Sequence, residues 1–402
     1  MTYQLSADPE FSFVLETFMS LANGGGANTA EVLRAASQIN PGDFESFYKE
    51  FKYLADQIQA LGASSDPKKY PVSVRDAMFR ASAYYRAADF FIHGDQSDPR
   101  INSLWDSQTA AFDQAIALLD IPGKRINVTT PYGFYVPVIF YKASPTNEAR
   151  STILVGTGYD AAQEDSYHTS CVHILARGWN CATYEGPGQP TVRRDQKIGF
   201  IKDWWNVVTP VVDYLGTRRD VDMDKLALIG ISFGGSLAPI AASHEHRFKA
   251  VLAIDGVYNL GQHLSTKFPP NLLQLFQSGD RTAFDSAMNE VRTNTTTLTA
   301  FRWLIDQGLF AFNTTSPFDW LTRFQAIGVE GLTDQIRGPV FVGSGQDDDD
   351  LAGQPEMLAN ALGDKAHYVL FKTDVGAGEH CQIGAEAHLS QTAFDWVAGI
   401  FG

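Results

Sequence analysis

The stretch that most limits the folds open to this 402-residue chain is residues 228–235, which contain the pattern Gly-x-Ser-x-Gly. A short apolar run of strand type ends just before Ser232, and a helical stretch begins just after it. A side chain at Gly230 or Gly234 would collide with neighbouring backbone, so glycine is required for a sharp turn. The pattern therefore predicts a strand, a tight turn and a helix that expose the hydroxyl of Ser232 as a nucleophile.

Strand-type and helical patterns alternate from residue 125 to the end of the sequence. A hairpin of two antiparallel strands is expected first, at 125–129 and 134–142. Further strands are expected at 151–157, 180–185, 226–231, 250–255, 339–344 and 368–372, with helices at 164–176, 200–214, 233–242, 356–362 and 385–400. This order predicts an α/β protein with a doubly wound, mostly parallel sheet. Ligands bind such sheets at the carboxyl ends of the strands, where Ser232 is expected to lie.

Two helical regions accompany the predicted sheet. Residues 1–120 form an N-terminal helical unit, with helices expected at 28–39, 44–61, 72–91 and 103–119. Residues 121–402 form the sheet domain, and the interval of about 257–337 within it is too long for a simple connection. That interval carries helical patterns at 271–277, 282–291, 299–310 and 317–324 and is predicted to be a lid over the strand ends.

Five aromatic residues gather in the third of the expected N-terminal helices. Aromatic bulk is most often used for packing, so we expect these side chains to lie in the core. The alternative is that some of them form a wall of a substrate pocket. The five residues are Phe79, Tyr84, Tyr85, Phe90 and Phe91.

A serine nucleophile needs a base, and the base needs an acid that orients it. His380 is the predicted base, because its glycine-rich loop at 376–381 joins the last strand to the last helix. Four consecutive aspartates at 347–350 follow the strand at 339–344 and form an acidic loop that is mostly solvated. Loop register favours Asp348 as the triad acid, and Asp347 remains the alternative.

The tetrahedral intermediate of such a reaction needs two backbone N–H donors. Phe233 follows the nucleophile directly and supplies one of them. Tyr159, in the turn after the strand at 151–157, is the predicted second donor, and Gly158 allows the backbone to approach closely.

The composition excludes several classes of partner. The formal net charge of −15 argues against nucleic acid and against an anionic membrane as partners. No signal peptide and no apolar run of transmembrane length is evident, so a cytoplasmic location is expected. The three cysteines, Cys171, Cys181 and Cys381, give no disulfide framework, which suits a reducing compartment, and Cys171 and Cys381 are expected to be small core residues.

No motif for a cofactor or metal is present, so neither is predicted. His168 and His173 lie five residues apart, which is a poor spacing for two ligands on one helical face.

With these residues in view, the chain resembles the α/β-hydrolase family. It is most similar to the branch that contains dihydroxypseudooxynicotine hydrolase and the fungal polyketide-shortening hydrolases of pigment pathways. Five segments carry the resemblance: 158–164, 185–189, 230–235, 348–355 and 376–381.

The resemblance implies an α/β-hydrolase fold and a Ser-His-Asp triad of Ser232, His380 and Asp348. It also implies cleavage of a C–C bond next to a carbonyl, or of an ester or thioester, in a polyketide-like or aromatic small molecule. The same triad serves acyltransferases and chain-releasing cyclases, which are the alternative. A ligand-binding protein without catalysis is less favoured, since candidates for all three triad members are present. A homodimer is implied by resemblance only, and the residues that bind substrate are not predicted.

Overall fold

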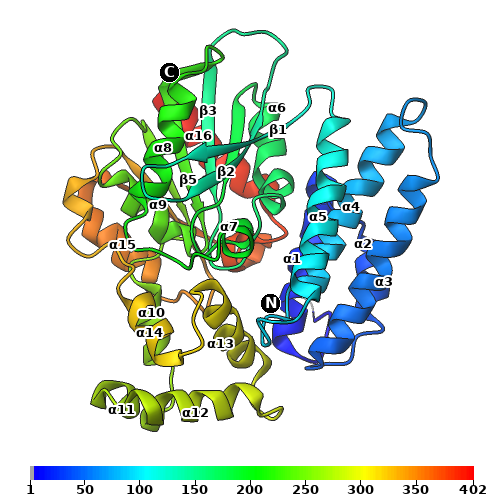
Figure 1. The fold of residues 1–402 in the computed structure, drawn as a ribbon. Helices are drawn as coiled ribbons and strands as arrows, with labels where there is room; N and C mark the ends of the chain where they lie inside the picture. The colour runs from blue at the N-terminus through cyan, green and yellow to red at the C-terminus, as the bar shows by residue number, and fades with distance from the viewer. Residues whose placement is uncertain (1–3) are drawn as a thin grey trace.

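A computed structural model describes residues 4–402, and its centre is one eight-stranded sheet (Figure 1). The strands lie in the order β1-β2-β4-β3-β5-β6-β7-β8. β2 pairs antiparallel with β1 and β4, and all other neighbours are parallel. The bounds are β1 Lys124–Thr129, β2 Tyr135–Tyr141, β3 Arg150–Gly156, β4 Asn180–Tyr184, β5 Val221–Ile231, β6 Ala250–Ile254, β7 Val340–Gly345 and β8 Ala366–Phe371. The predicted mostly parallel α/β sheet is thus confirmed, although β5 begins five residues earlier than expected.

Both faces of the inner strands are mostly buried, as parallel strands require, whereas the edge strands β1 and β8 are partly exposed. Along β5, Ala227 and Ile229 pack toward one face, together with the N-terminal helices. Leu226 and Leu228 pack toward the opposite face, together with the helices that follow β4 and β5. Short helices connect neighbouring strands along the chain: α6 Val172–Ala176, α7 Pro190–Asp195, α8 Trp205–Gly216, α9 Gly234–Ala242 and α15 Gln354–Leu362. Helix α16 Glu386–Phe401 follows the last strand.

Five helices precede the sheet and lie to one side of it (Figure 1). They are α1 Pro9–Ser20, α2 Thr29–Ala36, α3 Phe44–Ala63, α4 Pro71–Asp89 and α5 Arg100–Ala117, and we call them the N-terminal helices. Helix α1 was not among the predicted ranges. It begins at Pro9 because the Asp8 side chain accepts from the Phe11 amide, and proline needs no hydrogen bond in a first turn.

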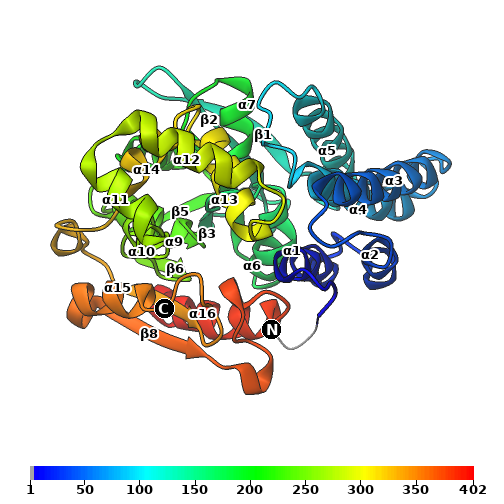
Figure 2. The ribbon, with the colours of Figure 1, turned by 90° about the horizontal axis from the view of Figure 1, so that it is seen from below.

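A second group of helices is inserted between β6 and β7. These inserted helices are α10 Leu260–Thr266, α11 Pro270–Ser278, α12 Arg281–Thr293, α13 Thr299–Ala311 and α14 Pro317–Gln325. Figure 2 shows them lying across the ends of β3, β5 and β6, with α1 close to α13. Helix α10 was not predicted, whereas the other four lie where the apolar spacing indicated.

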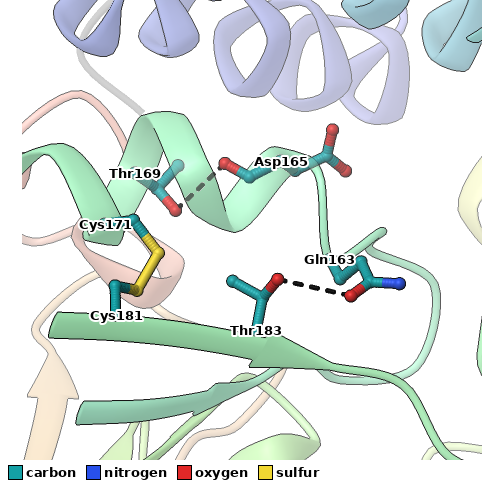
Figure 3. Close-up of a disulfide and its surroundings, with 6 residues drawn as sticks. All are labelled: Gln163, Asp165, Thr169, Cys171, Cys181 and Thr183. Carbon is teal, nitrogen blue, oxygen red and sulfur yellow. Dashed lines mark hydrogen bonds between the residues drawn. A yellow bond between two sulfur atoms is a disulfide. The ribbon is translucent and has the colours of Figure 1, made fainter. Parts of the chain in front are cut away.

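A disulfide joins Cys171 to Cys181, so the expectation of unpaired cysteines is wrong for these two (Figure 3). Cys171 ends a π-helical turn at Tyr167–Cys171, within the range predicted as one continuous helix. After the short helix α6 the chain turns back into β4, which brings the two buried cysteines to a Cα–Cα distance of 5.5 Å. Cys381 is unpaired. Because these two cysteines are paired, cysteine usage no longer supports the expectation of a reducing compartment.

Across residues 4–402, none of the helices combines the length and the apolar character that crossing a membrane requires.

Candidate active site

Ser232 lies at the turn between β5 and α9 with φ of +60°, which is unusual for a residue with a side chain. A Cβ built at Gly230 would collide with the carbonyl oxygen of Gly234. A Cβ at Gly234 would lie 2.8 Å from the carbonyl oxygen of Thr157. The steric argument for glycine at both positions therefore holds, and the strained turn presents Ser232 to a cavity.

His380 lies between Ser232 and Asp348. Its Nε2 atom is 2.9 Å from Ser232 Oγ, and its Nδ1 atom is 2.7 Å from Asp348 Oδ2. An ionised carboxylate only accepts hydrogen bonds, so Nδ1 carries the proton and Nε2 is free to accept the serine proton. Burial alone would lower the pKa of His380, but the neighbouring Cys381 and Asp348 raise it well above its ordinary value.

Asp348 follows β7 and is the aspartate that the structure brings to His380. Its Oδ1 atom accepts from the amides of Asp350 and Leu351, both at 3.1 Å. Burial opposes ionisation, yet the charge and hydrogen bond of His380 hold the pKa of Asp348 at about 2. Asp347, the alternative candidate, instead has its amide bonded to the Gly378 carbonyl oxygen at 2.8 Å. Asp348 is therefore the better candidate for the acid.

A second buried carboxylate, Asp255, lies at the end of β6 and was not predicted as a site residue. Its oxygens accept from the Cys381 amide and from Gln382 Nε2, both at 2.8 Å, which anchors the loop that carries His380. Burial raises the pKa of Asp255 to about 7, and the charge of Asp348 adds to the effect. In the sequence, the only indication of a role for Asp255 was its position at the end of an apolar strand.

The donor atoms of Asp255, His380 and Cys381 lie within 4.8 Å of one another. Among residues 4–402, these three are the His, Cys, Asp or Glu side chains that lie close enough together to hold a metal ion. Each Asp255 oxygen already accepts a hydrogen bond, and His380 Nε2 faces Ser232. Hydrogen bonding alone accounts for the arrangement.

The two predicted oxyanion donors lie on segments that touch each other. A Cβ built at Gly158 would be 2.8 Å from the amide nitrogen of Phe233, so the backbone before Tyr159 packs directly on the turn at Ser232. Among residues 4–402, neither the Phe233 amide nor the Tyr159 amide donates to another protein group. Both amides thus remain available to an oxygen of a bound substrate.

A cavity of about 600 Å³ opens in front of Ser232 and His380. The N-terminal helices contribute Phe13 and Phe18, the inserted helices contribute Trp303 and Leu304, and α16 contributes Leu389, among others. The cavity is therefore mainly apolar and is built from three regions that are distant in sequence.

Phe90 is the one of the five clustered aromatic residues that lines this cavity. The others are buried in the core, as expected: Phe79, Tyr84, Tyr85 and Phe91.

Glu10, in the first turn of α1, also lines the cavity. Burial, together with the charges of Asp350 and Asp160, raises its pKa to about 8. Glu10 is therefore mostly protonated at neutral pH and can donate a hydrogen bond into the cavity. No sequence pattern indicated this role, because Glu10 lies in a segment that is simply polar.

The chain is similar to known hydrolases over nearly all of its length. A model of the prolyl oligopeptidase family matches residues 192–295. The 20-hydroxy-prefusarin hydrolase FUS2 of Gibberella moniliformis is 27% identical over 416 residues, which cover 99% of this chain and 98% of that protein. The α/β hydrolase psoB of Aspergillus fumigatus is 29% identical over 433 residues, covering 100% of this chain and 95% of that protein.

A solved structure has the same fold. The crystal structure of 2,6-dihydroxy-pseudo-oxynicotine hydrolase matches with a TM-score of 0.73 at 17% identity, covering 96% of this chain and 95% of that one. This agreement extends over the N-terminal helices as well as the sheet. The chain therefore has an α/β-hydrolase fold and is a hydrolase that is similar, over nearly its whole length, to fungal hydrolases such as FUS2 and psoB.

Proposed function

We propose that the chain is a serine hydrolase in which Ser232 attacks a carbonyl carbon, His380 is the base and Asp348 is the acid. The observation that carries the proposal is the pair of distances at His380, 2.9 Å to Ser232 Oγ and 2.7 Å to Asp348 Oδ2. These contacts supply the three groups that nucleophilic catalysis by serine requires, in the order that proton transfer needs.

The reaction begins when His380 Nε2 takes the proton of Ser232 as Oγ bonds to the carbonyl carbon. The amides of Phe233 and Tyr159 stabilise the negative oxygen of the tetrahedral intermediate. When the intermediate collapses, His380 returns its proton to the leaving group, which is an alkoxide, a thiolate or the carbon of an enolate. Water, activated by His380, then attacks the acyl-enzyme, and the acid product leaves.

The substrate that we propose is an uncharged, polyketide-like or aromatic molecule with a β-dicarbonyl, ester or thioester group. The support is the cavity, which offers about 600 Å³ and walls of aromatic and aliphatic side chains. A relative, FUS2, is named for hydrolysis of 20-hydroxy-prefusarin. A protonated Glu10 would provide one polar contact to a carbonyl oxygen of such a substrate.

The test is intact-protein mass spectrometry after treatment with a fluorophosphonate probe. We expect one adduct on the wild-type protein, none on Ser232→Ala and almost none on His380→Ala. The proposal would be refuted if the folded wild-type protein formed no adduct, or if Ser232→Ala formed the same adduct.

Product analysis then separates hydrolysis from acyl transfer. A panel of β-dicarbonyls, esters and thioesters is incubated with and without an acceptor alcohol. Free acid in both cases supports hydrolysis, whereas an ester that forms only with the alcohol would identify an acyltransferase.

A further inference from the structure

The loop that carries Tyr159 is held by side chains from three different parts of the fold. Gln189, in the loop before α7, donates through Nε2 to the carbonyl oxygens of Thr157 at 2.8 Å and of Gly158 at 3.2 Å. Gln307, on α13, donates to the Tyr159 carbonyl oxygen at 3.1 Å. The Asp160 carbonyl oxygen accepts from a side chain of α4, Arg86 Nη2, at 2.6 Å. Four consecutive carbonyl groups are thus fixed from outside the loop.

The bond from Gln189 bears directly on the Tyr159 amide. The Gly158 carbonyl and the Tyr159 N–H belong to one planar trans peptide group, in which they point in opposite directions. Gln189 therefore fixes the direction of the Tyr159 N–H by holding the oxygen on the other side. Gln307 holds the next peptide group in the same way, so Tyr159 lies between two fixed planes.

The amide of Gln307 is itself oriented by His93, in the turns that follow α4. His93 Nδ1 lies 2.6 Å from Gln307 Oε1. Gln307 Nε2 donates to Tyr159, so Oε1 must accept, and His93 Nδ1 must carry a proton. On its other side, His93 Nε2 lies 3.2 Å from Asp89 Oδ2. The N-terminal helices thereby fix the amide of an inserted helix.

Burial makes these contacts effective. Gln189 is fully buried, and Gln307 and His93 are only 4% and 5% exposed. Water does not compete for hydrogen bonds at such positions, so each bond restricts the loop more than it would at the surface. The Tyr159 side chain adds to the restriction, because its hydroxyl donates to the Leu304 carbonyl oxygen on α13 at 3.3 Å.

We propose that Gln189 and Gln307 are positioning residues that aim the Tyr159 N–H at the oxyanion, and that His93 sets the orientation of Gln307. The inference rests on the proposed serine-hydrolase function. It means that the inserted and N-terminal helices do more than enclose substrate, because they hold the second oxyanion donor in place.

The test measures the rate at which a fluorophosphonate labels Ser232 in wild type, Gln189→Met and Gln307→Met. Methionine keeps the length of the side chain and removes its hydrogen bonds. Saturation kinetics separate probe binding, KI, from the bond-forming step, kinact. We expect KI to stay constant and kinact to fall about 100-fold for Gln189→Met and about 10-fold for Gln307→Met, because one lost oxyanion donor costs about 100- to 1,000-fold.

Gln274→Met is the matched control, because Gln274 is an exposed glutamine on the inserted helix α11. Its kinact should equal that of wild type. His93→Phe keeps an aromatic ring against Phe310, whose ring centroid is 4.3 Å from that of His93, and loses the bond to Gln307. The His93→Phe variant provides the same test if a glutamine variant does not fold. We expect its kinact to fall less than that of Gln307→Met, and the double variant to lose no more kinact than Gln307→Met alone.

The outcomes are distinct. If wild type is not labelled at Ser232, the proposed function fails and this inference fails with it. If wild type is labelled and the folded variants keep its kinact, the inference alone is overturned. A rise in KI with constant kinact would also overturn it, because the glutamines would then shape the pocket and leave the oxyanion donor unaffected.

Discussion

The strongest consequence of the site geometry concerns replacement of Asp348 by asparagine, which changes one atom and one charge. Asp348 Oδ1 accepts from the amides of Asp350 and Leu351, and Oδ2 accepts from His380. An asparagine can meet the two amides only with its oxygen. Its NH₂ group must then face His380 Nδ1.

The reverse orientation would leave two amide N–H groups without an acceptor. One unsatisfied buried donor costs about 1–3 kcal/mol, so two cost about 2–6 kcal/mol together. At 1.36 kcal/mol per factor of ten, the first orientation is favoured by at least about 30-fold.

In that orientation the NH₂ group donates to Nδ1 of His380, so the imidazole proton moves to Nε2. Nε2 then donates to Ser232 and no longer accepts its proton. The wrong tautomer and the missing negative charge act together, and we expect kinact of fluorophosphonate labelling to fall about 10⁴-fold in Asp348→Asn, as it does for this exchange in serine proteases.

The comparison is with Asp347→Asn, the same exchange one residue earlier, which should leave the rate unchanged. Thermal unfolding of each variant checks that the fold is intact. The reasoning would be refuted if a folded Asp348→Asn kept a rate within tenfold of wild type, or if Asp347→Asn lost as much.

Three further predictions concern charge and covalent linkage. Burial raises the pKa of Asp255 from 3.8 to about 7, so the folded state resists its ionisation and wild type should lose stability as the pH rises through that range. When Tm is measured at pH 5 and at pH 8, it should be lower at pH 8 for wild type and similar at both pH values for Asp255→Asn. An equal drop in Tm in both proteins would contradict this prediction. Burial and neighbouring carboxylates raise the pKa of Glu10 to about 8, so above that pH Glu10 can no longer donate a hydrogen bond into the cavity, and probe binding (KI) should weaken above pH 8 in wild type but not in Glu10→Gln. Cys171 and Cys181 are ten residues apart, and reduction of their disulfide should lower the free energy of unfolding by about 3 kcal/mol in denaturant titrations. The free energy of unfolding of the double alanine variant should not change when the reductant is added.

Local patterns were enough to predict the sheet and the residues that surround Ser232. The turn at Ser232 needs glycines at fixed offsets, and the loops of Asp348 and His380 each follow a strand whose apolar run is evident in the sequence. Strand order then brings these loops together, because parallel strands end at the same edge of a sheet.

The residues that sequence patterns did not indicate act across long intervals. Gln307 meets Tyr159 over 148 positions, and neither residue carries a local motif for that contact. Glu10 reaches the cavity only because α1 packs beside α13, which no periodicity encodes. The disulfide was missed for a related reason, since its formation depends on a π-helical turn that stands over β4.

The cavity keeps the proposed reacting groups and the side chains of its walls on separate elements, and this has a consequence for how substrate preference can change. Ser232, Asp348 and His380 lie on loops that follow strands, whereas side chains such as Phe13, Trp303 and Leu389 project from surrounding helices. Substitutions of these wall side chains that leave the contact from Gln307 to Tyr159 unchanged can remodel the space for a substrate without moving a reacting atom. A library that varies helical wall positions should therefore yield altered selectivity at a high frequency of active clones.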